Sequence, residues 1–152
     1  MRTLSRGRTL WGLSFKPETD DMREASSVTL IESLIDAGAK VRAYDPIAMD
    51  EAKRAFPTHW FEEEKIVLAA HQYDVLEGVD ALALVTEWNP FRSPDFHLML
   101  KIMKQPVIVD GRNLYDPKLM HEFGFEYSGI GRSTEQTVRS TPVAEVRSIN
   151  AI

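Results

Sequence analysis

The sequence of 152 residues is long enough for one domain with its own core, and its 43% hydrophobic and 27% charged residues are typical of a soluble globular protein. A net charge of −5 gives no general cationic surface, which argues against nucleic acid or anionic lipid as a partner. No apolar run approaches the roughly 20 residues of a membrane span, no secretory signal is visible, and the absence of cysteine excludes disulfides and thiol nucleophiles. We therefore expect a cytoplasmic protein.

The chain begins with the pattern of a strand followed by a helix. A short apolar strand is predicted at 10–15, and the proline after it has no N–H for a sheet. The start of the helix has two possible caps, Asp21 with Glu24 or the pair at 26–27, and Gly38 suits the position after its last turn. One face of this helix carries apolar residues at helical spacing, namely Val28, Ile31, Leu34 and Ile35.

The middle of the chain predicts shorter elements. A strand at 40–44 is closed by Asp45 and Pro46, and the acidic run 62–64 is interpreted as a solvated face or loop. The remaining elements are a helix at 48–56, a strand at 66–69 and a helix at 71–77 that stops at Gly78.

The second half opens with an uninterrupted apolar run at 81–85, which predicts a central strand buried on both faces. A helix should follow, with Ser93 as its N-cap and Pro94 in its first position. The chain then predicts a buried strand at 107–109, a helix from Asp116 to Gly124 and an edge strand at 125–128.

Strands and helices alternate with connections too long for hairpins. This alternation predicts an α/β fold, a doubly wound and mainly parallel sheet of about six strands with helices on both faces. We place one domain at 1–132 and interpret the polar residues 133–152 as a loosely attached tail. Ligands bind such sheets beyond the carboxyl ends of the strands. The polar and aromatic residues predicted to follow those ends are Lys16, Asp45, Glu87, Trp88, Arg112 and Asn113.

Lys16 and Arg112 have the charge and the position for a phosphate site. Lysine offers a point charge and arginine a planar fork that can bind two oxygens. Alternatively, each is a surface cation paired with Asp20, Asp21 or Asp110, and position alone does not decide between these roles.

Other sites have less support. Trp88 could stack on a ligand or a partner subunit, or lie in the core. Gly129-Ile130-Gly131 lacks the third glycine of a dinucleotide fingerprint, and no such fingerprint surrounds Gly12, so NAD binding by this domain alone is not expected. Asp45 is interpreted as the cap of its own turn. The four histidines are dispersed without ligand spacing, so no metal site is predicted.

A phosphoacceptor receiver domain is the rival from a different class. It would need its acceptor aspartate after the third strand and its lysine after the fifth, whereas the lysine in this chain follows the first.

Four motifs carry a family resemblance: the stretch from Gly12 to Ala25, Tyr44-Asp45-Pro46, Thr86-Glu87-Trp88 and Asp110-Gly111-Arg112-Asn113. Over residues 7–132 the chain resembles the C-terminal, UDP-binding domain of bacterial UDP-glucose 6-dehydrogenases, in the UDP-glucose/GDP-mannose dehydrogenase family. This domain is Rossmann-like without the dinucleotide fingerprint.

The resemblance implies roles for four residues. Phe15 and Lys16 would line the nucleotide-sugar site, and Arg112 would contact the phosphate-bearing part of the substrate. Arg23 would approach the NAD pyrophosphate across a domain boundary. Without the resemblance, Arg23 is interpreted as a helix charge paired locally with Asp20 or Glu24.

The resemblance also implies that the whole enzyme oxidises C6 of UDP-glucose in two NAD-dependent hydride transfers, through a covalent intermediate on cysteine. The NAD-binding domain, the catalytic cysteine and a central helical domain would lie upstream, so we expect no catalytic residue and no activity in this chain alone. Expected partners are UDP-glucose or UDP and those upstream domains, within a homo-oligomer. The alternative is a nucleotide-sugar-binding or regulatory module without catalysis.

Overall fold

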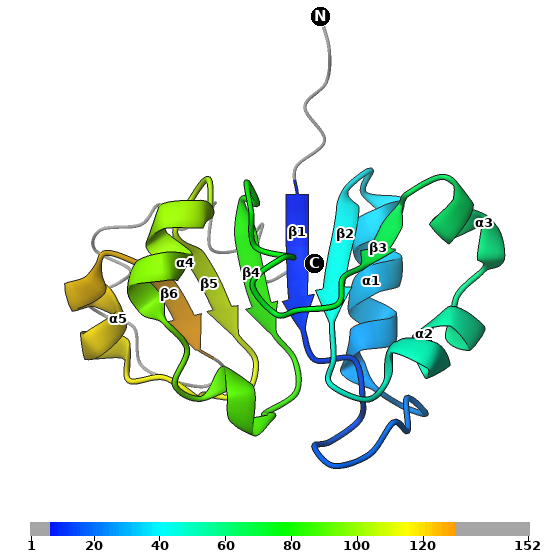
Figure 1. The fold of residues 1–152 in the computed structure, drawn as a ribbon, viewed down its shortest axis with the longest axis horizontal. Helices are drawn as coiled ribbons and strands as arrows, with labels where there is room; N and C mark the ends of the chain where they lie inside the picture. The colour runs from blue at the N-terminus through cyan, green and yellow to red at the C-terminus, as the bar shows by residue number, and fades with distance from the viewer. Residues whose placement is uncertain (1–6, 130–152) are drawn as a thin grey trace, which may run out of the picture.

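The computed structural model describes residues 7–129. Their six strands form one parallel sheet in the order β3-β2-β1-β4-β5-β6 (Figure 1). The strands are β1 (Gly7–Trp11), β2 (Lys40–Tyr44), β3 (Ile66–Leu68), β4 (Ala81–Leu84), β5 (Val107–Asp110) and β6 (Glu126–Gly129). The helices are α1 (Ser26–Asp36), α2 (Met49–Ala55), α3 (Thr58–Glu62), the 3-10 helix η1 (Asn89–Phe91), α4 (Phe96–Ile102) and α5 (Pro117–Phe123). This arrangement confirms the predicted doubly wound α/β fold.

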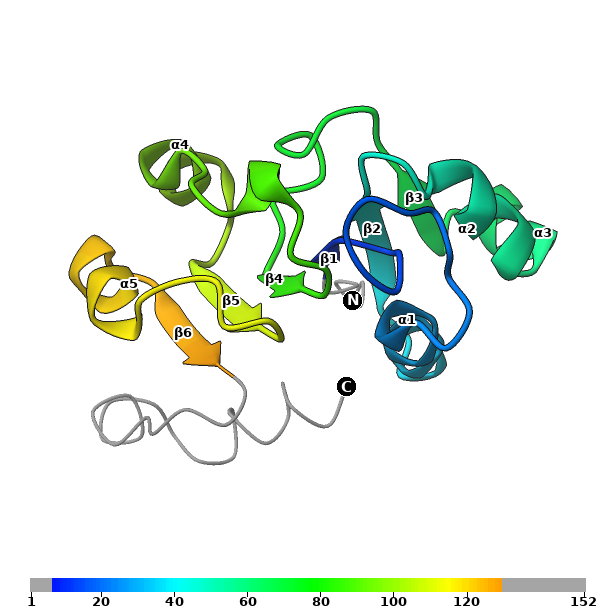
Figure 2. The ribbon, with the colours of Figure 1, turned by 90° about the horizontal axis from the view of Figure 1, so that it is seen from below.

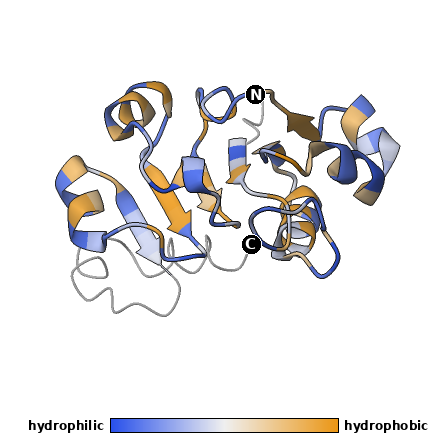
Figure 3. Cartoon of the chain, turned by 60° about the horizontal axis from the view of Figure 1, so that its bottom comes forward, coloured by the Kyte–Doolittle hydropathy of each residue, from blue (hydrophilic) through white to orange (hydrophobic). Residues whose placement is uncertain are grey.

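Helices cover both faces of the sheet. Figure 2 shows α1 on one face and α4 and α5 on the other. One core cluster joins α1 to β1 and β2, and the second joins α4 and α5 to β4 and β5. β5 is hydrophobic along most of its length, and hydrophilic residues gather in the loops (Figure 3). The sheet therefore holds the core on both faces, and the polar loops beyond it are the part of the fold that can carry function.

The first strand is displaced from its prediction. β1 ends at Trp11, whereas the sequence indicated a strand at 10–15. Gly12 ends it because its φ of 103° is left-handed. The position requires glycine, since an added Cβ would lie 2.5 Å from the backbone nitrogen of Thr86. Phe15 consequently lies in the loop beyond the strand.

The prediction of a helix at 71–77 is wrong, because these residues form turns. Side chains of β1 donate hydrogen bonds to carbonyl oxygens of this segment, which in a helix would accept from the amides of the next turn. The indole Nε1 of Trp11 donates to the carbonyl of Gln72 at 2.8 Å, and the hydroxyl of Thr9 donates to that of Val75.

The ends of α1 are partly as predicted. No side chain caps its start, since Ala25 is the N-cap and the Ser27 hydroxyl instead donates to the carbonyl of Leu13 at 2.6 Å. Gly38 follows its last turn with a φ of 86°, as predicted.

The predicted N-cap of α4 is wrong by two residues. Its N-cap is Asp95, whose carboxylate accepts from the amide of Leu98 at 3.0 Å, and Ser93 lies outside the helix. α5 begins and ends as predicted, with Asp116 as N-cap and Gly124 left-handed at its end.

The other predicted elements, β2, α2, β3, β4, β5 and β6, are confirmed to within one or two residues, whereas α3 and η1 were not predicted. Every helix within residues 7–129 is too short or too polar to cross a bilayer. The domain end at 132, the proposed tail at 133–152 and the last two residues of the Gly129-Ile130-Gly131 motif lie outside the described residues.

Candidate functional site

The candidate site lies where the winding of the sheet reverses. β1 and β4 are neighbours, and the chain builds outward from them in opposite directions. Ligands of open α/β sheets bind beyond the carboxyl ends of the strands at such a point. Here the loops after β1, β2, β4 and β5 meet, and we call this surface the rim.

Asp45, directly after β2, connects two of the rim loops. Its side chain is buried, with 1% exposure. One carboxylate oxygen accepts from the amides of Ile47 and Ala48 at 2.9 and 2.8 Å, which confirms the predicted cap of its own turn. The other accepts from the amides of Leu13 and Ser14 at 2.8 and 3.1 Å, in the loop after β1.

Trp88 adds the loop after β4 to this connection. Its indole Nε1 donates to the same oxygen of Asp45 at 3.0 Å, and its side chain is only 4% exposed. Trp88 is therefore a core residue, and its alternative role as a stacking platform for a ligand is wrong.

The loop after β1 carries Phe15 and Lys16 and is held through its backbone. The hydroxyl of Thr86 donates to the carbonyl of Ser14 at 2.7 Å, and the amide of Phe15 donates to the carbonyl of Asp21 at 2.7 Å. The side chains themselves face outward, with Phe15 46% exposed and Lys16 also exposed. A fixed backbone thus presents an apolar ring beside an ammonium group.

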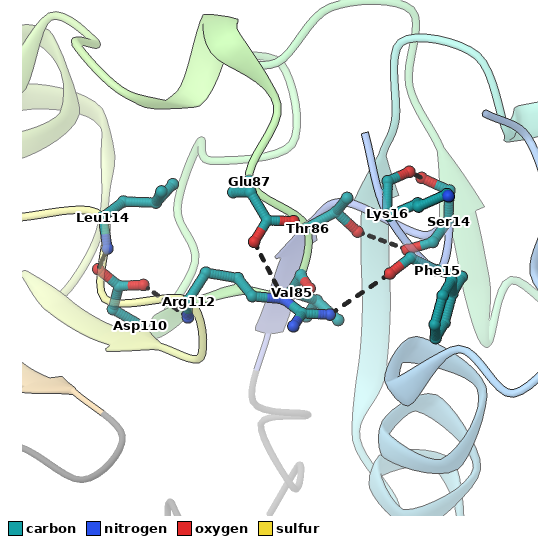
Figure 4. Close-up of polar contacts among 9 residues, drawn as sticks. All are labelled: Ser14, Phe15, Lys16, Val85, Thr86, Glu87, Asp110, Arg112 and Leu114. Atoms are coloured by element: carbon teal, nitrogen blue, oxygen red, sulfur yellow. Dashed lines mark hydrogen bonds and ion pairs between the residues drawn. The ribbon is translucent and has the colours of Figure 1, made fainter. Parts of the chain in front are cut away.

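Arg112, after β5, reaches across the end of β4 to this loop (Figure 4). Its Nε donates to the carbonyl of Val85 at 2.7 Å, and its Nη2 lies 3.5 Å from the carbonyl of Phe15, 97 residues away in sequence. Its Nε is 4.0 Å from a carboxylate oxygen of Glu87. The structure therefore brings the guanidinium to the backbone of the Phe15 and Lys16 loop.

Asp110 fixes the turn that carries Arg112. It is fully buried, and it accepts from the backbone amide of Arg112 at 3.0 Å and from the hydroxyl of Tyr127 at 2.6 Å. The alternative pairing of the Arg112 side chain with Asp110 is therefore wrong: among the described contacts, Arg112 donates to Asp110 only through its backbone amide, and the guanidinium lies near Glu87 instead. Within residues 7–129, Lys16 forms no ion pair with Asp20 or Asp21.

The comparisons identify the family of this arrangement. Residues 9–117 match the UDP binding domain of the UDP-glucose/GDP-mannose dehydrogenase family. The chain belongs to this family.

Curated relatives agree with this assignment. UDP-glucose 6-dehydrogenase of Pseudomonas aeruginosa is 50% identical over 128 residues, which are 83% of this chain and 28% of the relative. The enzyme of Rhizobium meliloti is 40% identical over 121 residues, 80% of this chain and 26% of the relative. The chain thus spans little more than a quarter of the length of these relatives.

Solved structures show the same fold. A UDP-glucose dehydrogenase from Pyrobaculum islandicum matches 85% of this chain and 26% of its own chain, with a TM-score of 0.65 and 27% identity. An NDP-N-acetyl-D-galactosaminuronic acid dehydrogenase from Methanosarcina mazei matches 85% of this chain and 25% of its own, with a TM-score of 0.71 and 25% identity.

Arg23, the residue that the family resemblance assigns to NAD, lies apart from Arg112 in the segment before α1. Its side chain is 89% exposed and pairs with Asp21, with Nη2 to Oδ2 at 2.9 Å and Nε to Oδ1 at 3.1 Å. The predicted local partners, Asp20 and Glu24, are wrong. The hydrogen bond from Arg23 lowers the pKa of the Asp21 carboxyl to about 2, so this pair is charged at neutral pH.

Sequence reasoning missed how Asp45, Thr86 and Val85 hold the Lys16 loop and Arg112. All three follow strands that flank β1 or β4, so their closeness depends on the order of the strands in the sheet, which the motifs alone do not give. The described residues contain no group of three or more histidine, aspartate or glutamate side chains that could hold a metal.

Proposed function

We propose that the chain is the UDP-binding domain of a UDP-glucose 6-dehydrogenase and that it binds the UDP part of UDP-glucose at the rim. The observation that carries this proposal is the reach of the Arg112 guanidinium to the loop of Phe15 and Lys16 at the point where the winding of the sheet reverses. The names of the relatives in this family support UDP-glucose as the substrate.

The chemistry of the rim suits a nucleoside diphosphate. Lys16 supplies a point charge, and Arg112 supplies a fork for two oxygens. The contacts with Val85 and Phe15 engage two of the five N–H groups of Arg112 within the described part of the chain, so donors remain for phosphate oxygens. The exposed ring of Phe15 offers an apolar surface at the edge of this anion site.

In the whole enzyme, bound NAD would accept the hydrides removed from C6 of the sugar. The residues that bind most of NAD and the cysteine nucleophile would belong to upstream domains, because this chain has no cysteine and no dinucleotide fingerprint. Arg23 fits a role toward the NAD pyrophosphate, since its charged side chain is at the surface. The upstream domains are the proposed partners, in a cytoplasmic homo-oligomer.

Calorimetric titration of the chain with UDP tests the proposal. Each charge-assisted hydrogen bond contributes roughly 1.5–3 kcal/mol, so Lys16→Ala and Arg112→Ala should each weaken UDP binding by about 10- to 100-fold. Lys104→Ala is the matched control, because this exposed lysine lies at the opposite end of the sheet, where its amide donates to the carbonyl of Val79.

The two losses should also be coupled. Since both cations would bind one diphosphate, the double variant should lose less than the sum of the single losses, and added salt should weaken the wild type more than either variant. If both single variants keep the affinity of the wild type while circular dichroism shows an intact fold, the rim is not the UDP site.

A further inference from the structure

We infer that Asp45 is a positioning residue of the proposed UDP site, which holds the loop of Phe15 and Lys16 in the shape that binds phosphate. The inference rests on the proposed function, because it assigns Asp45 to the rim at which UDP would bind. Asp45 itself is buried and need not touch the ligand.

The loop after β1 depends on side chains for its shape. Residues 12–16 lie outside regular secondary structure. The amides of Gly12 and Phe15 donate to backbone carbonyls, those of Tyr44 and Asp21, whereas the two amides between them donate to a side chain. Asp45 accepts both amides at the start of the loop, those of Leu13 and Ser14, and lies 3.2 Å from the Ser14 hydroxyl. The single proton of that hydroxyl is within reach of both this carboxylate and the carbonyl of Lys16, which lies 2.9 Å away, so Ser14 Oγ links Asp45 to the backbone of the lysine.

The same carboxylate fixes the loop against two further parts of the rim. Trp88 donates to it from the loop after β4, and the amides of Ile47 and Ala48 donate from the loop after β2. One oxygen of Asp45 therefore serves the loops after β1 and β4, and the other serves the turn after β2. Loss of either oxygen would leave buried N–H groups without an acceptor, which the loop could relieve only by moving.

Asparagine is the sharpest substitution, because it keeps the size of the side chain and has one acceptor oxygen instead of two. If the remaining oxygen serves Ile47 and Ala48, the amides of Leu13 and Ser14 face an NH2 group. If it serves Leu13 and Ser14, the turn after β2 loses its cap. In the first case the loop that carries Lys16 loses its acceptor directly, and in the second case the turn that places Asp45 against that loop is weakened.

The experiment combines UDP titration with amide hydrogen exchange on the full chain. Asp45→Asn should weaken UDP binding about tenfold, and it should add little when Lys16 is already replaced by alanine, because its effect acts through the placement of that lysine. Exchange at residues 13–16 should become faster, while exchange in β4 and β5 stays unchanged.

Thr9→Val is the matched control. It removes another buried hydrogen bond, from the Thr9 hydroxyl to the carbonyl of Val75, without touching the rim loops. It should lower stability and leave UDP affinity unchanged. A purely structural role for Asp45 predicts the same pattern for Asp45→Asn.

Three results would overturn the inference: unchanged UDP affinity in Asp45→Asn, a loss that adds fully to that of Lys16→Ala, or unchanged exchange at 13–16. If Asp45→Asn does not fold, Ser14→Ala decides, because it deletes only the hydroxyl between Asp45 and Lys16; weaker UDP binding supports the inference and equal binding refutes it. If the wild type does not bind UDP, the proposed function fails, and the exchange rates alone decide whether Asp45 holds the loop.

Discussion

The ion pair of Arg23 and Asp21 gives the clearest prediction for single residues. Because the Arg23 hydrogen bond lowers the pKa of the Asp21 carboxyl from 3.8 to about 2, an NMR titration of Asp21 should have its midpoint near pH 2. Because the pKa of Asp21 is lower in the folded state than in the unfolded state, the ion pair stabilises the protein at pH values above the unfolded pKa. This contribution is lost as the pH falls from about 4 through about 2.

Arg23→Ala should move the Asp21 midpoint back toward 3.8. Arg54→Ala is the control, since Arg54 forms a similar exposed pair with Glu51, at 2.6 Å. A midpoint near 2 that persists without Arg23 would contradict the hydrogen bond as the cause.

Arg23 should also matter for NAD in an enzyme that contains the upstream domains. Its guanidinium is exposed beyond its pair with Asp21, and phosphate oxygens are good acceptors for such a fork. Arg23→Ala should therefore raise the KM for NAD more than the KM for UDP-glucose, and Arg54→Ala should change neither. An unchanged KM for NAD would restrict Arg23 to its local pair with Asp21.

At the scale of elements, two helices end with the same hydrogen-bond pattern and different residues. After α1, the amide of Gly38 donates to the carbonyl of Ile35, and the next amide donates one residue further back. After α3, the amide of Glu64 donates to the carbonyl of Phe61 in the same way. Both positions are left-handed, with a φ of 86° at Gly38 and 58° at Glu64. Glycine adopts this conformation readily, whereas glutamate is strained in it.

Glu64→Gly should therefore stabilise the chain by about 0.5–1 kcal/mol, since relief of the strain exceeds the entropy that glycine adds to the unfolded state. Gly38→Ala is the opposite test and should destabilise by about 1 kcal/mol through conformation alone, because an added Cβ there meets nothing within 4 Å. Urea unfolding of both variants measures the two effects. A lower midpoint for Glu64→Gly would mean that the glutamate side chain contributes more than its strain costs.

For the whole molecule, the sequence predicts the alternating pattern better than the contacts between distant segments. The apolar runs of β4 and β5 and the signals of α5 are local, so they are visible in the chain. The start of β1 is not visible in the sequence, because Arg8 and Thr9 are polar. Thr9 is nevertheless buried in the structure, where its hydroxyl donates to the carbonyl of Val75. The same contact explains why 71–77 forms turns instead of the predicted helix.

The candidate site shows the same difference between local patterns, which the sequence predicts, and contacts between distant segments, which it does not. The positions of Lys16 and Arg112 after strands could be predicted, because a parallel sheet places all carboxyl ends at one edge. The bonds of Arg112 to Val85 and of Asp45 to the Lys16 loop could not, because they depend on which strands are neighbours. Local patterns therefore predict the candidate residues, and the strand order determines how they are held.

Catalysis is the prediction that concerns the chain as a whole. Incubated with UDP-glucose and NAD, the purified chain should form no NADH, because it contains no cysteine and no glycine-rich dinucleotide turn. UDP-glucose 6-dehydrogenase of Pseudomonas aeruginosa, of which this chain spans 28%, serves as the positive control under the same conditions. UDP binding without NADH formation would fit a substrate-binding domain that requires upstream domains for chemistry. NADH formation that persists through repeated purification would instead require an NAD site and a nucleophile within these 152 residues. It would contradict the proposal that this chain binds UDP while other domains supply the chemistry.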